Sequence, residues 1–80
     1  MQSLKEPERR IVGARQVLRA IQEKTVAHVY IARDADPFVT RPVMDACEKN
    51  GVRFTEVESM TGLGQHCGID VKASVAALLA

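Results

Sequence analysis

The feature that most constrains the fold is an apolar strand pattern that leads directly into a helix start. Residues 27–32 read Ala-His-Val-Tyr-Ile-Ala, a β-branched and aromatic run typical of a strand in the middle of a sheet. Asp34-Ala-Asp-Pro37 follows, and Asp36 can cap a helix that has Pro37 at its first position. A strand that runs into a helix in this way predicts an α/β fold with helices on both faces of a sheet.

The segments on either side repeat this alternation. Arg9 to Val12 fits a short edge strand, and Gly13 ends it. Apolar residues then recur at helical spacing up to Lys24-Thr25, namely Ala14, Val17, Leu18 and Ile21. Because Pro42 cannot donate a backbone hydrogen bond, we expect a tight turn over residues 37–40 and a regular helix only over about 41–50. That helix would bury Val43, Ala46 and Cys47 and end in a left-handed cap at Asn50-Gly51.

The C-terminal third predicts one more strand and one more short helix. Val52 to Val57 alternates like a strand, and Ser59 can cap a helix that runs to about Cys67, where Gly68 stops it. The tail, residues 71–80, is rich in alanine and leucine, which favour a helix, but its apolar run also fits a buried strand. Residues 1–8 fit a loose polar terminus or a partial turn of helix. Eighty residues predict a single domain, 1–80.

Composition excludes several classes of protein. No apolar run approaches the roughly 18 residues needed to cross a bilayer, and no signal peptide opens the chain, so we expect a cytoplasmic protein with reduced thiols and no membrane partner. Gly62-Leu-Gly64 lacks the spacing and the lysine of a nucleotide-binding loop. Cys47, His66 and Cys67 lack the spacing of a zinc site, and we expect both thiols to serve as packing groups. No catalytic constellation of serine, histidine and carboxylate is visible, which predicts no enzyme, cofactor or metal.

Charge is more informative in its distribution than in its sum. The net charge is +1, but residues 1–20 carry five basic and two acidic groups, whereas residues 21–80 carry six basic and eight acidic groups. Arg15, Gln16 and Arg19 share the exposed side of one predicted helix start, where two guanidiniums oppose the helix dipole. Such a surface suits phosphates and guanine edges, and it also fits an ordinary solvated face.

Three blocks of sequence resemble one known family. Gly13-Ala-Arg-Gln with Arg19, the Asp34–Pro37 turn and Leu63-Gly-Gln-His-Cys-Gly-Ile69 occur in the order found in the ribosomal protein L7Ae family of kink-turn RNA binders. The chain looks most like the short bacterial branch of that family, and the resemblance runs from about Arg10 to Leu79. It implies a three-layer α-β-α sandwich around a four-stranded mixed sheet, with Val71 to Leu79 as the last strand. The family's usual C-terminal helix is lacking.

The resemblance also implies where RNA binds. In the family, the first helical turn after the glycine enters the RNA groove at tandem sheared G·A pairs, an acidic residue recognises looped-out nucleotides, and an apolar loop covers a flipped-out base. Arg15 and Gln16 fall where base edges are read, Arg19 where the backbone is met, Asp36 at the acidic position, and 69–71 in the loop. We expect this loop to hold Ile69 and Val71 out toward solvent; the alternative is that both turn inward on one face at the start of the last strand. The implied RNA-binding residues are Gly13, Ala14, Arg15, Gln16, Arg19, Asp36, Ile69, Asp70 and Val71.

The chain departs from the archaeal and eukaryotic pattern, which has asparagine and glutamate at positions 15 and 16. Arginine can still pair with guanine O6 and N7, and glutamine keeps an acceptor. The resulting hypothesis is a monomeric, non-enzymatic protein that stabilises kink-turn RNA in ribosomal RNA or a riboswitch. The alternatives are a ribosomal protein that uses another RNA motif and a protein-interaction module. A substrate-recognition module like those of RNA methyltransferases, and more remotely an enzyme acting through Cys67, also stay open.

Overall fold

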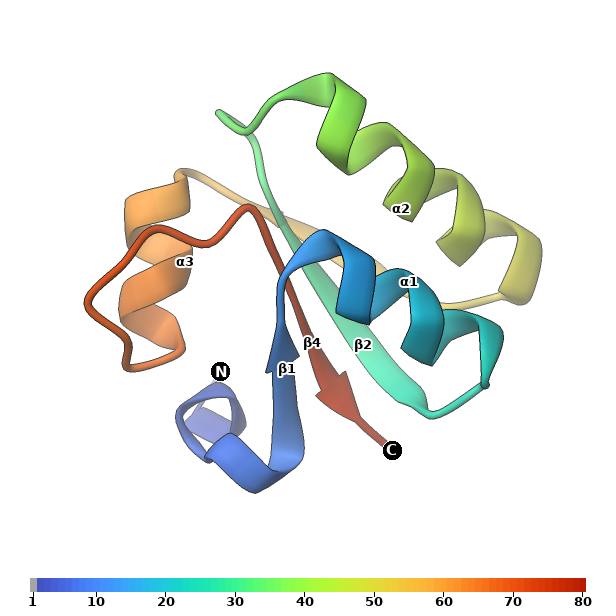
Figure 1. Cartoon of the computed structure of the whole chain (residues 1–80), viewed down its shortest axis with the longest axis horizontal. Coiled ribbons are helices and arrows are strands. Elements are labelled where there is room, and N and C mark those ends of the chain that lie inside the picture. Colours follow the sequence, from blue (N-terminus) through green and yellow to red (C-terminus); the bar gives the residue numbers. More distant parts are fainter. Residues whose placement is uncertain (1) are drawn as a thin grey trace.

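The protein is built on one four-stranded mixed sheet. The computed structural model describes residues 2–80, so the expectation for residue 1 lies outside the described residues. The strands are β1 (Arg10–Val12), β2 (Val26–Ala32), β3 (Phe54–Val57) and β4 (Val75–Leu79), in the order β1-β4-β2-β3 (Figure 1). β4 lies antiparallel to both β1 and β2, whereas β2 and β3 are parallel. The predicted edge strand and the predicted central strand are therefore confirmed.

Helices cover both faces of this sheet. α1 (Ala14–Gln22) and α2 (Pro37–Asn50) pack on one face, and α3 (Met60–His66) lies on the other with the N-terminal 3-10 turn η1 (Gln2–Lys5) (Figure 1). Two aliphatic clusters fill the two interlayer spaces. The first is Val17, Ile21, Val29, Ile31, Val43, Cys47, Val75 and Ala77, and the second is Leu4, Ala32, Ala35, Leu63, Cys67, Ala73 and Ala76. The three-layer α-β-α sandwich is the one expected.

Near its start the chain forms helical turns, one of the two alternatives that the sequence left open for residues 1–8. η1 is followed by a second 3-10 turn, η2 (Pro7–Arg9), and Leu4 is fully buried in the second cluster. The guanidinium of Arg10 donates to the carbonyl oxygens of Leu4 (Nε, 2.9 Å) and Cys67 (Nη2, 3.3 Å). One side chain thereby ties the N-terminal turn and the end of α3 to β1.

The expected turn at 37–40 is wrong, because α2 is one continuous helix from Pro37 to Asn50 with Pro42 inside it. A proline there lacks the N–H that would bond the carbonyl of Phe38, one turn back, and its ring crowds that carbonyl. Phe38 and Pro42 are both exposed, so water can satisfy that carbonyl. The predicted caps are correct: Asp36 accepts from the Phe38 N–H, and Gly51 adopts the left-handed conformation at φ 66°.

Strands β3 and β4 begin later than predicted. The N–H of Val52 donates to the carbonyl of Cys47, so this residue belongs to the end of α2 instead of the strand. Residues 69–73 bond to α3 instead of to the sheet: Ile69 N–H donates to Gly64 O (3.1 Å) and Ala73 N–H to Met60 O (3.1 Å). The segment Val71–Ser74 is therefore a loop, and β4 starts at Val75. No helix in the described residues is long and apolar enough to cross a membrane.

Candidate nucleic-acid interface

Three segments that are distant in the sequence meet at one end of the sheet. β1 and β2 both run antiparallel to β4, so their C-terminal ends lie beside its start. The Gly13 N–H donates to Val75 O (2.9 Å), and the Ala32 N–H donates to Ser74 O (2.9 Å). We call this end the loop edge; it comprises residues 13–16, 33–36 and 74–75, and the loop of residues 69–73 leads into it along α3 (Figure 1). Of the residues assigned to RNA by resemblance, those at positions 13–16 and Asp36 lie on it. Arg19 is one helical turn further along α1, and residues 69–71 lie beside α3 in the loop that leads to Ser74.

The start of α1 offers unfilled backbone donors. Gly13 stands at the N-cap with φ 111°, a conformation that other residues rarely adopt, and it supplies no side-chain cap. A Cβ built on Gly13 would meet nothing within 4 Å, so the surface above it is open. The first turn contains no acidic residue. These N–H groups and the positive end of the helix dipole therefore favour an anionic or electron-rich partner.

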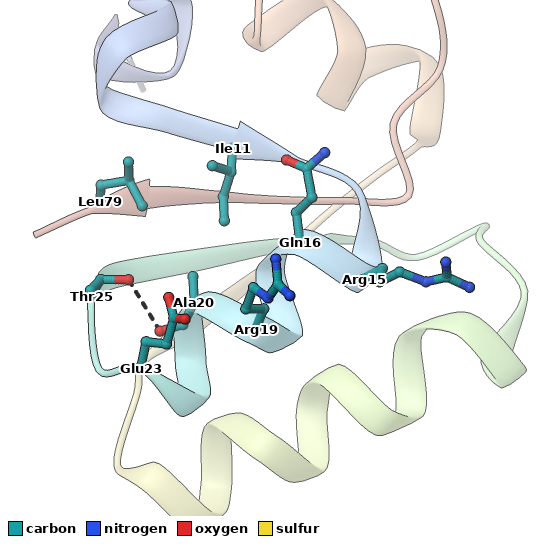
Figure 2. A pocket seen from close by; sticks show the side chains of 8 residues that line it. All are labelled: Ile11, Arg15, Gln16, Arg19, Ala20, Glu23, Thr25 and Leu79. Atoms are coloured by element: carbon teal, nitrogen blue, oxygen red, sulfur yellow. Dashed lines mark hydrogen bonds between the residues drawn. The ribbon is translucent and has the colours of Figure 1, made fainter.

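Arg15, Gln16 and Arg19 are exposed, as predicted, and they line a surface hollow beside α1. The apolar side chains of Ile11, Ala20 and Leu79 contribute to its lining, as do Glu23 and Thr25. Figure 2 shows Gln16 and Arg19 leaning from α1 toward Ile11, whereas the Arg15 guanidinium points away from that strand.

The two arginines keep their charge available. Among residues 2–80, ion pairs join Arg9 to Glu6 and Arg33 to Glu56, and neither involves Arg15 or Arg19. A guanidinium without a carboxylate partner can donate all of its N–H groups to a ligand.

The two carboxylates of the turn after β2 are held by backbone donors. Asp36 Oδ1 accepts from the Phe38 N–H (2.9 Å), which fixes the side chain while leaving it exposed with further acceptor capacity. Asp34 Oδ1 accepts from the Met60 N–H (2.8 Å) and so ties this turn to the start of α3. The sequence analysis did not predict this role of Asp34, although two aspartates beside a helix start provide two carboxylates that can accept hydrogen bonds from backbone N–H groups.

The two apolar residues of the loop before β4 differ in their exposure to solvent. Val71 is 68% exposed, as expected. Ile69 is partly buried against the second core cluster, so the expectation that both would project into solvent is wrong for Ile69. The cause is the loop's course along α3, which breaks the strand alternation that would have placed Ile69 and Val71 on one face. Asp70 is exposed between them, and all three line a shallow hollow with Thr61, Gln65 and Lys72.

Gly64 permits this course. It is buried in α3, and a Cβ at this position would collide with the carbonyl oxygen of Val71. Only a glycine lets the loop backbone lie directly on the helix. Position 64 therefore determines where Asp70 and Val71 stand, a role that sequence reasoning assigned to no residue.

The cysteines are packing groups. Both are buried, Cys47 in the first cluster and Cys67 in the second. Burial raises the pKa of the Cys47 thiol to about 11, with a smaller contribution from the Glu48 carboxylate. Burial also raises the pKa of Cys67, although the Arg10 charge opposes it. Within the described part of the chain, no three histidine, cysteine or acidic side chains gather as metal ligands would.

Fold and site together define a small three-layer α/β domain that presents a cationic helix start beside an acidic turn and an apolar loop. The whole chain, residues 1–80, matches the family described as "Ribosomal protein L7Ae/L30e/S12e/Gadd45 family". The chain therefore belongs to this family, as its three sequence blocks indicated.

Individual relatives agree with this assignment. A protein of Caldanaerobacter subterraneus subsp. tengcongensis, named as RNA-binding, is 45% identical over 71 residues, which cover 89% of this chain and 87% of that one. The RNA-binding protein YbxF of Geobacillus stearothermophilus is 36% identical over 69 residues, covering 86% of this chain and 84% of the relative. The solved structure of a Giardia lamblia 15.5kD RNA binding protein superposes with a TM-score of 0.91 at 28% identity, over 99% of this chain and 69% of that chain.

Proposed function

We propose that this protein binds RNA and that it recognises and stabilises the kink-turn, a bend formed by tandem G·A pairs next to a bulge. The observation that carries the proposal is the convergence of three segments on the loop edge through the backbone bonds of Gly13 to Val75 and Ala32 to Ser74. A helix start, an acidic turn and an apolar loop on one surface can engage a stem, its looped-out nucleotides and a flipped base together. The names of the relatives support an RNA partner.

The start of α1 would read the G·A pairs. An A-form major groove is too narrow for side chains, so a protein reaches base edges only where a kink opens the RNA. Arg15 can donate to guanine O6 and N7, and Gln16 can both donate and accept. Arg19 stands one turn further along the helix and would meet phosphates. The open space above Gly13 would allow the RNA to approach the helix start closely.

The other two segments would hold the unpaired nucleotides. The Asp36 carboxylate can accept from base amino groups, and its bond to the Phe38 N–H keeps it in place. Val71 would cover the flat face of a flipped-out base, with Asp70 beside it. Ile69 would act as an anchor for the loop instead of as a contact, since it packs against the core.

The proposed action is selection of a conformation. Free RNA of this kind samples kinked and extended forms, and a protein that binds the kinked form more tightly shifts the population toward it. This action requires no chemical step. In the proposed role, the protein binds as a monomer to a kink-turn of ribosomal RNA or of a riboswitch and stabilises it.

A titration of the purified protein with two RNA duplexes tests the proposal. One duplex carries a kink-turn, and the other has Watson–Crick pairs in place of the tandem G·A pairs. We expect tighter binding to the first by at least about tenfold, since each good base-edge contact contributes about 1–3 kcal/mol. Equal affinity for both would instead support a ribosomal protein that reads another RNA motif. Absence of RNA binding would favour a protein-interaction module.

A further inference from the structure

The largest exposed apolar side chain of the described residues lies beside the loop edge without a role in the proposed site. Phe38 is 91% exposed; of the other exposed large apolar residues, Val39 (36%) follows it in α2, whereas Val71 (68%) lies in the loop that packs on α3. An exposed aromatic ring lowers the solubility of the protein and does not stabilise its core. Because Phe38 and Val39 directly follow Asp36, which is proposed to face RNA, the bound RNA is the partner that could cover the ring.

The surroundings of Phe38 are rigid and carry one cation. Phe38 is the second residue of α2, and its N–H is fixed by Asp36 Oδ1 at 2.9 Å. Pro37 and Pro42 flank it and restrict the backbone, and Arg41 lies one helical turn on; these four residues line one hollow. The opposite side of the helix is buried through Thr40, Val43 and Cys47, so the ring cannot turn into the core.

We infer that Phe38 is a stacking platform for one unpaired nucleotide of the bound RNA, with Arg41 positioned for its phosphate. This inference rests on the proposed function and adds a contact to it. Every base has an aromatic face, so a single exposed ring with an adjacent guanidinium matches the two parts of a nucleotide. Asp36, two residues earlier, already faces the looped-out nucleotides in the proposed complex, which brings such a base within reach of the ring.

A protein partner fits this surface less well. The apolar patch consists of one ring and two prolines, whereas a stable protein interface buries roughly 800 Å² on each partner. Further along α2 the exposed side chains are charged or polar, namely Asp45, Glu48, Lys49 and Asn50, so the apolar surface does not continue. Its size suits a nucleobase.

Affinity measurements on the full chain test the contact. With kink-turn RNA, Phe38→Ala should weaken binding roughly 5- to 100-fold, the range of a lost base–aromatic stack. Phe38→Leu keeps an apolar side chain without the ring and should recover little, whereas Phe38→Trp should bind like the wild type. Arg41→Ala should lower the salt dependence by about one phosphate contact. These side chains are exposed, so the variants should unfold at wild-type temperature.

Fluorescence gives an independent measurement, because the chain contains no tryptophan. A stacked base should quench the indole emission of the Phe38→Trp variant in proportion to bound RNA. Gln22→Trp is the matched control, since position 22 is exposed and neutral but stands at the opposite end of α1. Its emission should not change.

The outcomes separate this inference from the proposed function. If Arg15→Ala loses kink-turn binding while Phe38→Ala binds like the wild type, or if the Phe38→Trp emission stays unquenched at saturation, the stacking platform is wrong and RNA recognition stands. If the wild-type protein does not distinguish the kink-turn from the substituted duplex, both are overturned. Weakened binding by Phe38→Ala and Phe38→Leu, together with quenching specific to position 38, supports the inference.

Discussion

Replacing Gly64 by alanine should move the loop that carries the apolar part of the site. Gly64 lies in α3, and an added Cβ would collide with the carbonyl oxygen of Val71, which is backbone and cannot rotate away. The loop is held at this point by the Ile69 N–H on Gly64 O and the Ala73 N–H on Met60 O, both at 3.1 Å. The loop must shift for the methyl group to fit, and these bonds must lengthen.

The expected cost follows from opposing contributions. Alanine in place of glycine favours a helix by about 1 kcal/mol. Overpacking costs about 1–3 kcal/mol, and each weakened backbone hydrogen bond costs about 1 kcal/mol. With two such bonds weakened, the net loss in the free energy of unfolding is roughly 2–4 kcal/mol, which lowers the melting temperature of a domain this small by roughly 8–30 °C.

Thermal unfolding followed by circular dichroism measures this loss, and Gly62→Ala provides the control. Position 62 lies in the same helix, but there a Cβ meets the Ser59 hydroxyl at 3.1 Å, a side chain instead of backbone. The control should stay within about 1 kcal/mol of the wild type. A Gly64→Ala protein as stable as Gly62→Ala would refute the argument that backbone contact fixes the loop.

Three further predictions concern separate parts of the molecule. Arg15→Ala should cost about 1–3 kcal/mol of binding to kink-turn RNA and less to plain duplex, whereas Arg19→Ala should weaken both alike; equal losses in titrations of both RNAs would contradict this division of roles. Val71→Ser should weaken kink-turn binding at an unchanged melting temperature, whereas Ile69→Ser should lower the melting temperature; the reverse pattern would show the loop assignment to be wrong. Because the buried thiol of Cys47 has its pKa raised to about 11, the stability that its protonated form contributes should be complete below about pH 9 and be lost as the pH rises toward 11. Urea unfolding at pH 8 and pH 10.5 measures the loss, which should be smaller in Cys47→Ala but not absent, because burial raises the pKa of Cys67 as well.

Elements that depend on local chemistry could be read from the sequence. The Asp36 and Ser59 caps, the left-handed Gly51 and the glycine before α1 each reflect the preference of one residue type for one backbone conformation. Pro42 misled the prediction, because an interior proline weakens a helix without always ending it, and here the carbonyl that loses its bond belongs to exposed Phe38, where water can replace the bond.

Features that depend on long-range contact were beyond the sequence. Leu4 packs in the second cluster, and Arg10 bonds its carbonyl and that of Cys67, which is 57 residues away from Arg10; no local pattern shows either contact. The late start of β4 follows from the packing of residues 69–73 on α3. The alanine-rich tail was assigned to a strand only through family resemblance, since its own propensity favours a helix.

The candidate site likewise combines features that local sequence predicts with features that depend on long-range contacts. The exposure of Arg15, Gln16 and Arg19 followed from helical periodicity alone. The meeting of the start of this helix with the turn after β2 and with the start of β4 is a property of the sheet order, in which β4 lies between β1 and β2. Nothing in the sequence indicated that Ile69 would pack inward while Val71 stays exposed. That difference arises because the loop backbone packs directly against Gly64, which has no Cβ.

The central claim is that the protein selects the kinked form of RNA, and fluorescence resonance energy transfer across the kink measures this directly. An RNA duplex labelled at both ends brings its dyes together only when it bends. Under buffer conditions in which the free RNA is mostly extended, added protein should raise the transfer efficiency until one protein is bound per RNA, and Arg15→Ala should need more protein. Binding that leaves the transfer efficiency at the value of the extended duplex would contradict the account.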